Sequence, residues 1–144
     1  MTADGAPAPR DTSEVALEQA FDDTNLFALR SAVAAHGTEL GLGPHRVADL
    51  VLAAQELAAN AVRHGGATPA TPARLRLGRS HDGVVCEVGD AGPGMPDPDG
   101  AGRQRVAIGA SAGRGLWIVR QLADTVEIGS TPDGLTVTAT FHLS

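Results

Sequence analysis

The longest regular pattern in the chain is a stripe of apolar residues between Pro44 and His64. Its members recur at three- and four-residue steps, which is the spacing of one face of an amphipathic helix. The stripe consists of Val47, Leu50, Val51, Ala54, Leu57, Ala58 and Ala61. Pro44 suits the first turn of a helix, where an amide hydrogen has no partner to lose. We therefore predict a helix from Pro44 to about His64 that stops at the following "GG".

Shorter patterns predict two further helices. The segment "TNLFALRSAVAAHGTEL", residues 24–40, is typical of a helix with Thr24 as its N-cap. Gly41 and Gly43 follow it and favour its end there. The segment "RGLWIVRQLAD", residues 114–124, predicts a third and shorter helix.

Alternating apolar and polar residues predict two hairpins. The first joins "ARLRLGR" to "GVVCEVGD", residues 73–79 and 83–90, and the second joins "TVEIGS" to "LTVTATFHL" around the turn "TPDG". A further strand is expected at "VALEQAF", residues 15–21, although its pattern is ambiguous. The order of elements predicts an α+β two-layer sandwich, with helices on one face of a mixed, mostly antiparallel sheet.

Two segments lack such patterns. Residues 1–13, rich in Ala, Pro and Asp, are expected to form a disordered tail, which leaves residues 14–144 as a single domain. Residues 91–112 are too long and too rich in Gly and Pro for a plain connection. Segments of this kind are typical of functional lids or of disordered linkers.

Composition narrows the classes of function. A net charge of -6 argues against direct binding to nucleic acid, because no basic stripe is available for phosphates. No apolar run approaches the roughly 20 residues that cross a bilayer, and the N-terminus resembles no signal peptide. We therefore expect a cytoplasmic protein without a membrane role. The chain contains no lysine, which excludes the phosphate-binding lysines of P-loop proteins and protein kinases.

The predicted long helix carries two polar residues on the face opposite its apolar stripe. Glu56 and Asn60 lie four residues apart, next to each other and roughly opposite the apolar stripe. A solvated polar face explains them on this evidence alone. The helix therefore leaves open whether they have a further function.

Glycines flank two stretches that could bind a ligand. Asp90 ends a predicted strand, where its carboxylate can accept a hydrogen bond from an exocyclic amine, and Gly92 and Gly94 let a flat ring approach the backbone. Gly113 and Gly115 leave the start of the third helix free of side chains, so its amide groups can face phosphate oxygens. Each stretch taken alone is better explained as an ordinary turn.

Taken together and in order, three motifs resemble one family. "ELAANA", "DAGPG" and "GRGL" are similar to the N, G1 and G2 boxes of the GHKL ATPase and kinase superfamily. The longer strings "ELAANAVRHGG" and "GRGLWIVRQLADTVEI" are most similar to the bacterial anti-sigma-factor serine kinases and their small actinobacterial relatives. The resemblance covers about residues 14–143 and implies the Bergerat ATP-binding fold.

The resemblance also implies roles for individual residues. Asn60 matches the ligand of the magnesium ion that bridges the phosphates of ATP, and Glu56 matches the general base of the ATPase and serine-kinase branches. Asp90 matches the carboxylate that binds the adenine amino group. The backbone around the nucleotide is matched by Gly92, Gly94, Gly113, Gly115 and Leu116. Five residues are candidates for positive charge near the phosphates, with a plain surface role left open: Arg63, His64, Arg103, Arg105 and Arg114. A pocket threonine common in the family corresponds to Leu135 or Thr136.

The resemblance implies an ATP-binding serine/threonine protein kinase of the anti-sigma-factor type. Such a protein binds a sigma factor and phosphorylates a STAS-domain antagonist, so that partner switching regulates transcription. Two alternatives remain open, which are a non-catalytic partner-binding module with ATP as a structural ligand and a stand-alone ATPase. The oligomeric state, including a homodimer, is also left open.

Overall fold

The fold combines five strands with three α-helices. The structure is a computed structural model, and it describes residues 14–95, 98, 100–103 and 114–143. The predicted tail at residues 1–13 lies outside the described residues. In chain order the elements are β1 (Glu14–Phe21), a 3-10 turn η1 (Leu26–Ala28), α1 (Leu29–Glu39), α2 (Pro44–Arg63), β2 (Ala73–Ser80), β3 (Gly83–Asp90), α3 (Arg114–Leu122), β4 (Thr125–Thr131) and β5 (Gly134–Phe141).

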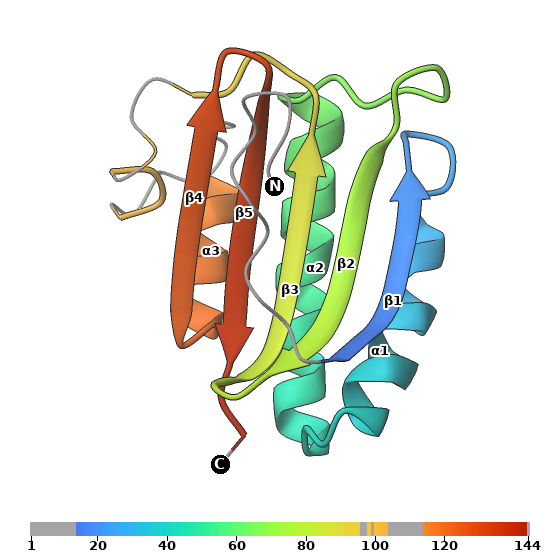
Figure 1. The fold of residues 1–144 in the computed structure, drawn as a ribbon, viewed down its shortest axis with the longest axis vertical. Helices are drawn as coiled ribbons and strands as arrows, with labels where there is room; N and C mark the ends of the chain where they lie inside the picture. Colours follow the sequence, from blue (N-terminus) through green and yellow to red (C-terminus); the bar gives the residue numbers. More distant parts are fainter. Residues whose placement is uncertain (1–13, 96–97, 99, 104–113, 144) are drawn as a thin grey trace.

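The strands form one twisted sheet with the order β1-β2-β3-β5-β4. The helices lie together behind this sheet, so the molecule has two layers (Figure 1). The predicted α+β two-layer sandwich is therefore confirmed. All four neighbouring pairs of strands are antiparallel, so the sheet of described residues lacks the parallel pairing that a mixed sheet would contain.

The predicted long helix, α2, lies at the centre of the helical layer and packs against α1, α3 and β3. Its apolar stripe faces the sheet, as the spacing predicted, and Leu50 and Ala58 are fully buried. The opposing side chains come from alternate positions of the middle strands, because neighbouring residues of a strand point to opposite faces. They include Leu75, Leu77, Cys86, Val88, Val137 and Ala139.

The start of the first helical segment differs from the prediction. Thr24 is not the N-cap of α1, because η1 precedes α1 and begins only at Leu26. The amide and hydroxyl groups of Thr24 instead donate hydrogen bonds to the Asp22 carboxylate. The sequence contains a good capping residue here, but a local Asp22 turn uses its hydrogen-bonding groups.

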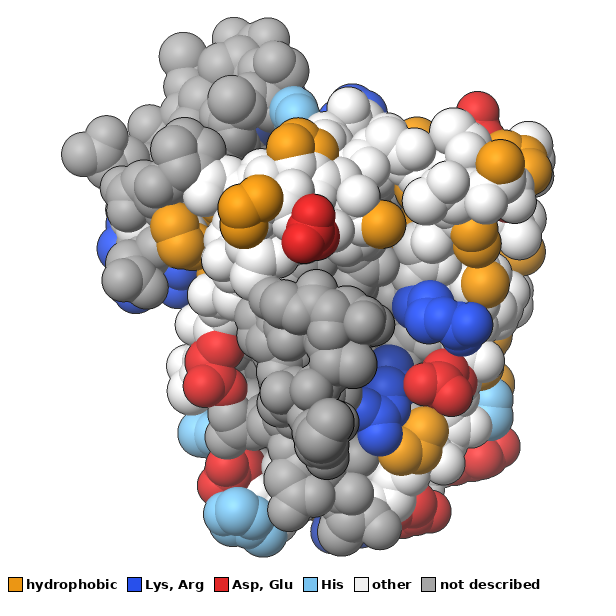
Figure 2. Space-filling model, turned by 45° about the horizontal axis from the view of Figure 1, so that its top comes forward, with side chains coloured by type: hydrophobic (Ala, Val, Ile, Leu, Met, Phe, Trp, Pro, Cys, Tyr) orange, Lys and Arg blue, Asp and Glu red, His pale blue; other side chains and the backbone are white. Residues whose placement is uncertain are grey.

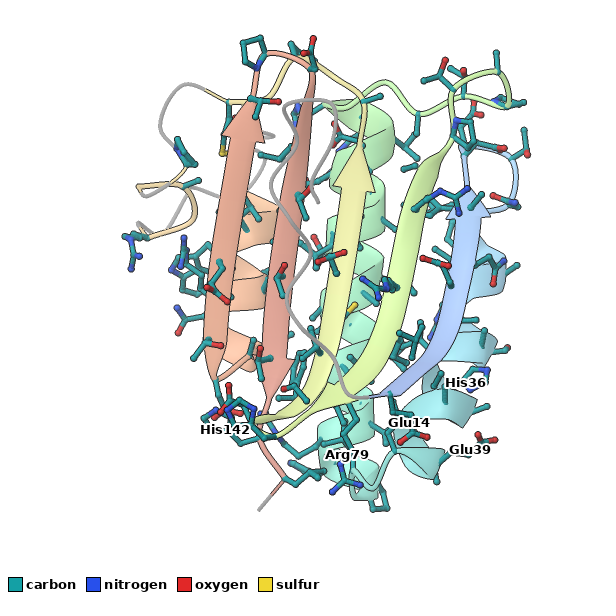
Figure 3. The ribbon with its side chains drawn as sticks, in the orientation of Figure 1. Glu14, His36, Glu39, Arg79 and His142 are labelled. Atoms are coloured by element: carbon teal, nitrogen blue, oxygen red, sulfur yellow. The ribbon has the colours of Figure 1, made fainter. Side chains whose placement is uncertain are left out.

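One end of the sandwich is held by charged side chains around Arg46, in the first turn of α2. The Arg46 guanidinium donates hydrogen bonds to Asp49, to Asp124 and, at 2.9 Å, to the Leu122 carbonyl oxygen. It also lies 5.1 Å from the centroid of the Phe141 ring, within range of a cation–π interaction. These contacts connect the N-terminus of α2 to the C-termini of α3 and β5, at the end where Figure 3 labels His142.

The surface carries charges of both signs. On the face drawn in Figure 2, acidic and basic side chains of the described residues are interspersed rather than gathered by sign. Among the described helices, none is both long enough and apolar enough to cross a membrane.

Candidate functional site

The last turns of α2 bring Glu56 and Asn60 against the start of α3. Both side chains are half-buried rather than exposed. A Cβ atom placed on Gly115 would lie 3.1 Å from Glu56 Oε1, 3.2 Å from Asn60 Oδ1 and 3.3 Å from Asn60 Nδ2. The carboxylate and the amide therefore converge on one point beside the first turn of α3, which is not the position of a fully solvated helix face.

Gly115 lets α3 approach these two side chains closely. Contacts of 3.1–3.3 Å are tighter than nearly all real Cβ contacts, so a side chain at residue 115 would occupy the space between α3 and α2. The first turn of α3 contains no acidic residue, and Arg114 is exposed there. A helix N-terminus without acidic side chains favours an anion, since its amide groups are unpaired and its dipole is positive.

Asp90 ends β3 with its side chain on the helical side of the sheet. Its Oδ1 atom accepts a hydrogen bond of 2.8 Å from the Gly92 amide. Burial raises the pKa of the Asp90 carboxyl above its ordinary value, and hydrogen bonds from the backbone of Gly92 and Leu135 offset part of that rise. The carboxylate is thus half-buried and held by backbone donors, with acceptor capacity left for a ligand amine.

The pairing of β3 with β5 shows which of the two candidate positions, Leu135 or Thr136, lies beside Asp90. Asp90 is paired with Leu135, and Gly89 is paired with Thr136. Because paired residues of antiparallel strands lie on the same face, Leu135 is beside Asp90 and Thr136 is on the opposite face. The position next to the candidate adenine-binding carboxylate is therefore apolar in this chain.

The segment after β3 is fastened to β4. Ser130 Oγ accepts a hydrogen bond of 2.8 Å from the Met95 amide and donates one of 3.2 Å to the Met95 carbonyl. Gly94 has a positive φ of 78°, and a Cβ atom there would overlap the Thr131 carbonyl oxygen. Glycine is required at residue 94 both by its backbone conformation and by this close approach.

The remaining predicted site residues differ in their exposure and in their contacts with Asn60. Arg63 and His64 are exposed at the end of α2, and Arg63 donates a long hydrogen bond of 3.4 Å to Asn60 Oδ1. Leu116 is buried in the core, and its backbone carbonyl group and Cβ atom lie against Gly102. Arg103 is exposed, whereas Gly113 and Arg105 lie outside the described residues.

Three residues near the site were missed by the sequence analysis. They are Gly65, Gly134 and Ser130, and each touches the segment around Asp90 from another part of the chain. A Cβ atom on Gly134 would overlap the Asp90 carbonyl oxygen. The glycines at "HGG" and "PDG" were visible as turn signals, but turns alone give no indication of which distant backbone they approach.

The donors present fit a magnesium nucleotide. No cluster of three or more His, Cys, Asp or Glu side chains suited to a metal exists among the described residues, so no all-protein cage forms there. Mg²⁺ usually keeps several waters and takes few protein ligands together with phosphate oxygens. One amide oxygen and one carboxylate beside the start of α3 suit that type of coordination.

Comparisons with known proteins identify the family and the fold of this chain. A family model described as the histidine kinase-like ATPase domain matches residues 20–141. Among solved structures, the crystal structure of the RsbU and RsbW domains of Rv1364c from Mycobacterium tuberculosis is similar in fold, with 24% sequence identity and a TM-score of 0.64. The match covers 88% of this chain but 32% of that chain. The comparison with curated proteins gives no match. From the family match and the three motifs, this chain belongs to the histidine kinase-like ATPase family, within the GHKL superfamily.

Proposed function

We propose that this protein is an ATP-dependent serine/threonine kinase of the anti-sigma-factor type. The observation that supports this most is the convergence of Glu56 and Asn60 on one point at the start of α3, within 3.1–3.2 Å of their oxygens. A carboxylate beside an amide metal ligand, next to an anion-binding helix end, suits phosphoryl transfer to a hydroxyl group.

In this proposal the nucleotide runs from Asp90 to the start of α3. Asp90 accepts a hydrogen bond from the adenine amino group, and ATP is the nucleotide that an ATPase-family domain implies. Asn60 would hold Mg²⁺ through its amide oxygen, and the ion would supply positive charge next to the phosphates. The backbone at Gly92, Gly94, Gly113 and Gly115 shapes the pocket. Candidates for further positive charge are Arg63, His64, Arg103, Arg105 and Arg114.

Glu56 acts as the general base. It takes the proton from a serine or threonine hydroxyl of the substrate while the hydroxyl oxygen forms a bond to the γ-phosphorus. The bond between the γ-phosphorus and the bridging oxygen breaks, and ADP leaves with the electron pair. The proton transfer makes the hydroxyl a competent nucleophile without a lysine, which the chain lacks.

The proposed protein substrate is a STAS-domain antagonist, and the proposed competing partner is a sigma factor. This assignment is supported by the strings "ELAANAVRHGG" and "GRGLWIVRQLADTVEI", which resemble the anti-sigma-factor kinases. Partner switching would then regulate transcription in the cytoplasm without direct contact between this protein and nucleic acid.

The test is transfer of labelled γ-phosphate to STAS-domain proteins that co-purify with this chain. We expect labelling of one partner on serine or threonine, dependent on Mg²⁺. Protein that binds ATP, retains its partner and labels nothing would overturn the kinase assignment and favour a partner-binding module. Release of phosphate without a partner would instead favour a stand-alone ATPase.

A further inference from the structure

We propose that Gly65 is a positioning residue that determines selectivity for adenine, by leaving space for the Asp90 carboxylate. The inference rests on the proposed function, because it assumes that Asp90 binds the adenine amino group. Gly65 follows the C-terminus of α2, and its amide donates a hydrogen bond of 3.2 Å to the Asn60 carbonyl oxygen. Its backbone therefore connects the proposed metal ligand to the proposed adenine-binding carboxylate.

The space around Gly65 is already filled by Asp90. A Cβ atom on Gly65 would overlap both the carboxyl carbon and Oδ2 of Asp90, and it would lie 2.7 Å from the Ala61 carbonyl oxygen. Real Cβ atoms essentially never approach this closely, so either Asp90 or the end of α2 would have to move. The two carboxylate oxygens consequently have different surroundings, with Oδ1 bonded to the Gly92 amide and Oδ2 against Gly65.

Gly92 contacts the backbone of Gly65 directly. A Cβ atom on Gly92 would lie 2.7 Å from both the Cα and the carbonyl oxygen of Gly65. Two backbone segments thus touch without a side chain between them, and the Asp90 carboxylate is held beside their contact. The orientation of the carboxylate depends on this close approach, since the same Gly92 supplies its hydrogen bond.

Glycine is needed at residues 65 and 66 of the "GG" pair for different reasons. Gly66 has a positive φ of 69°, and a Cβ atom there would meet nothing within 4 Å. Gly65 is not among the glycines with positive φ, so steric space and not backbone conformation requires glycine there. A methyl group at residue 66 strains the backbone, whereas one at residue 65 collides with the Asp90 carboxylate and with the Ala61 carbonyl oxygen. The pair therefore supplies a matched control.

The experiment measures the affinity of Mg·ATP and Mg·ITP by calorimetry for wild type, Gly65→Ala, Gly66→Ala and Asp90→Asn. ITP carries a carbonyl group where ATP carries the amino group. We expect wild type to prefer ATP by about 10-fold or more, as for one charge-assisted hydrogen bond. Gly65→Ala should reduce the preference to about 2-fold or less, similar to Asp90→Asn. Gly66→Ala should keep the wild-type preference while its Tm falls by about 4 °C.

A double-mutant cycle covers the case in which Gly65→Ala is strongly destabilised. Because the methyl group collides with Asp90 as well as with the Ala61 carbonyl oxygen, Gly65→Ala should lower Tm less in an Asp90→Ala background than in wild type. Equal losses of Tm in both backgrounds would overturn the inference, as would a Gly65→Ala protein that keeps the wild-type preference for ATP. Wild type that binds neither nucleotide at millimolar concentration would overturn the proposed function as well, so the two failures can be distinguished.

Discussion

The two ends of the sandwich are held together in opposite ways. At one end, long charged side chains connect the elements, with the Arg46 guanidinium bonded to Asp49, Asp124 and the backbone of Leu122. At the other end, glycines bring backbone against backbone around Asp90, and the side chains of Glu56 and Asn60 meet against Gly115. The two ends are joined by α2, whose 20 residues span about 30 Å.

The difference indicates where a ligand fits. Polar groups at the Arg46 end bond mainly to one another, so they contribute to stability and leave little capacity for a ligand. Polar groups at the Asp90 end are half-buried, and Asp90 uses backbone donors that leave acceptor capacity free. Substitutions at the two ends should therefore separate stability from nucleotide chemistry.

The largest effect is expected from Glu56→Gln. The substitution keeps the shape of the side chain and removes the proposed general base, so phosphoryl transfer to the partner should fall by about 10²–10⁴-fold while ATP binding persists. Initial rates of labelling measure this effect. Glu39→Gln is the control, because Glu39 is a carboxylate on α1 that is 71% exposed. Equal rates for wild type and Glu56→Gln would contradict the role of Glu56.

The second-largest effect is expected from Arg46→Ala, which should lower the stability of the fold and leave ATP binding unchanged. Arg46→Ala removes hydrogen bonds and the contact with Phe141, from a side chain that is 28% exposed. We expect a loss of about 2 kcal/mol in the free energy of unfolding, measured by denaturant titration, with little change in the Kd for ATP. Arg30→Ala, at an exposed position of α1, should cost less than about 0.5 kcal/mol. A large loss of ATP affinity in Arg46→Ala would contradict the prediction that the Arg46 end affects stability and not nucleotide binding.

A smaller effect is expected from Ser130→Ala, which removes the two hydrogen bonds to Met95. The free energy of unfolding should fall by about 1 kcal/mol. Amide hydrogen exchange at residues 91–95 should become faster, because the segment loses its attachment to β4. Thr125→Ala, at the exposed first residue of the same strand, is the control. Unchanged exchange at residues 91–95 in Ser130→Ala would show that Ser130 does not fasten this segment.

The smallest effect concerns the nucleotide-free protein and its pH dependence. Because burial raises the pKa of Asp90, the folded protein holds this proton more tightly than the unfolded chain does. The contribution of Asp90 to stability is then greatest below the ordinary carboxyl pKa of 3.8 and is lost as the pH rises through the raised pKa. Without nucleotide, Asp90→Asn should melt at or above the wild-type temperature at pH 7. A clearly lower melting temperature would contradict this account.

The sequence predicted the elements better than it predicted the contacts between them. The alternation in "ARLRLGR" and the apolar stripe of α2 correctly predicted a strand and a helix, because both patterns report burial on one face. Thr24 was wrongly predicted as an N-cap, since Asp22 competes for its hydrogen-bonding groups. The correct predictions and the wrong one all depend on residues that are close together in the sequence.

Long-range approaches could not be predicted in the same way. Glu56 and Asn60 were expected to be neighbours on α2, but their convergence on Gly115 depends on how α3 packs across α2. Gly65 and Ser130 carry no local signal of their contacts with Asp90 and Met95, because those contacts join segments about 25–35 residues apart. Only the resemblance to a family indicated in advance that these motifs meet.

Calorimetric titration of Mg·ATP into wild type and Asp90→Asn measures whether the Asp90 end binds an adenine nucleotide. We expect saturable binding by wild type and an affinity at least about 10-fold weaker for Asp90→Asn, because the substitution removes a charge-assisted acceptor. Binding by wild type should also weaken as the pH falls toward the raised pKa of Asp90, because the carboxylate then takes up a proton and loses its negative charge. This weakening should begin at a higher pH than it would for a carboxyl with the ordinary pKa of 3.8. Absence of binding by wild type at millimolar ATP, or equal affinity for both proteins, would contradict the claim.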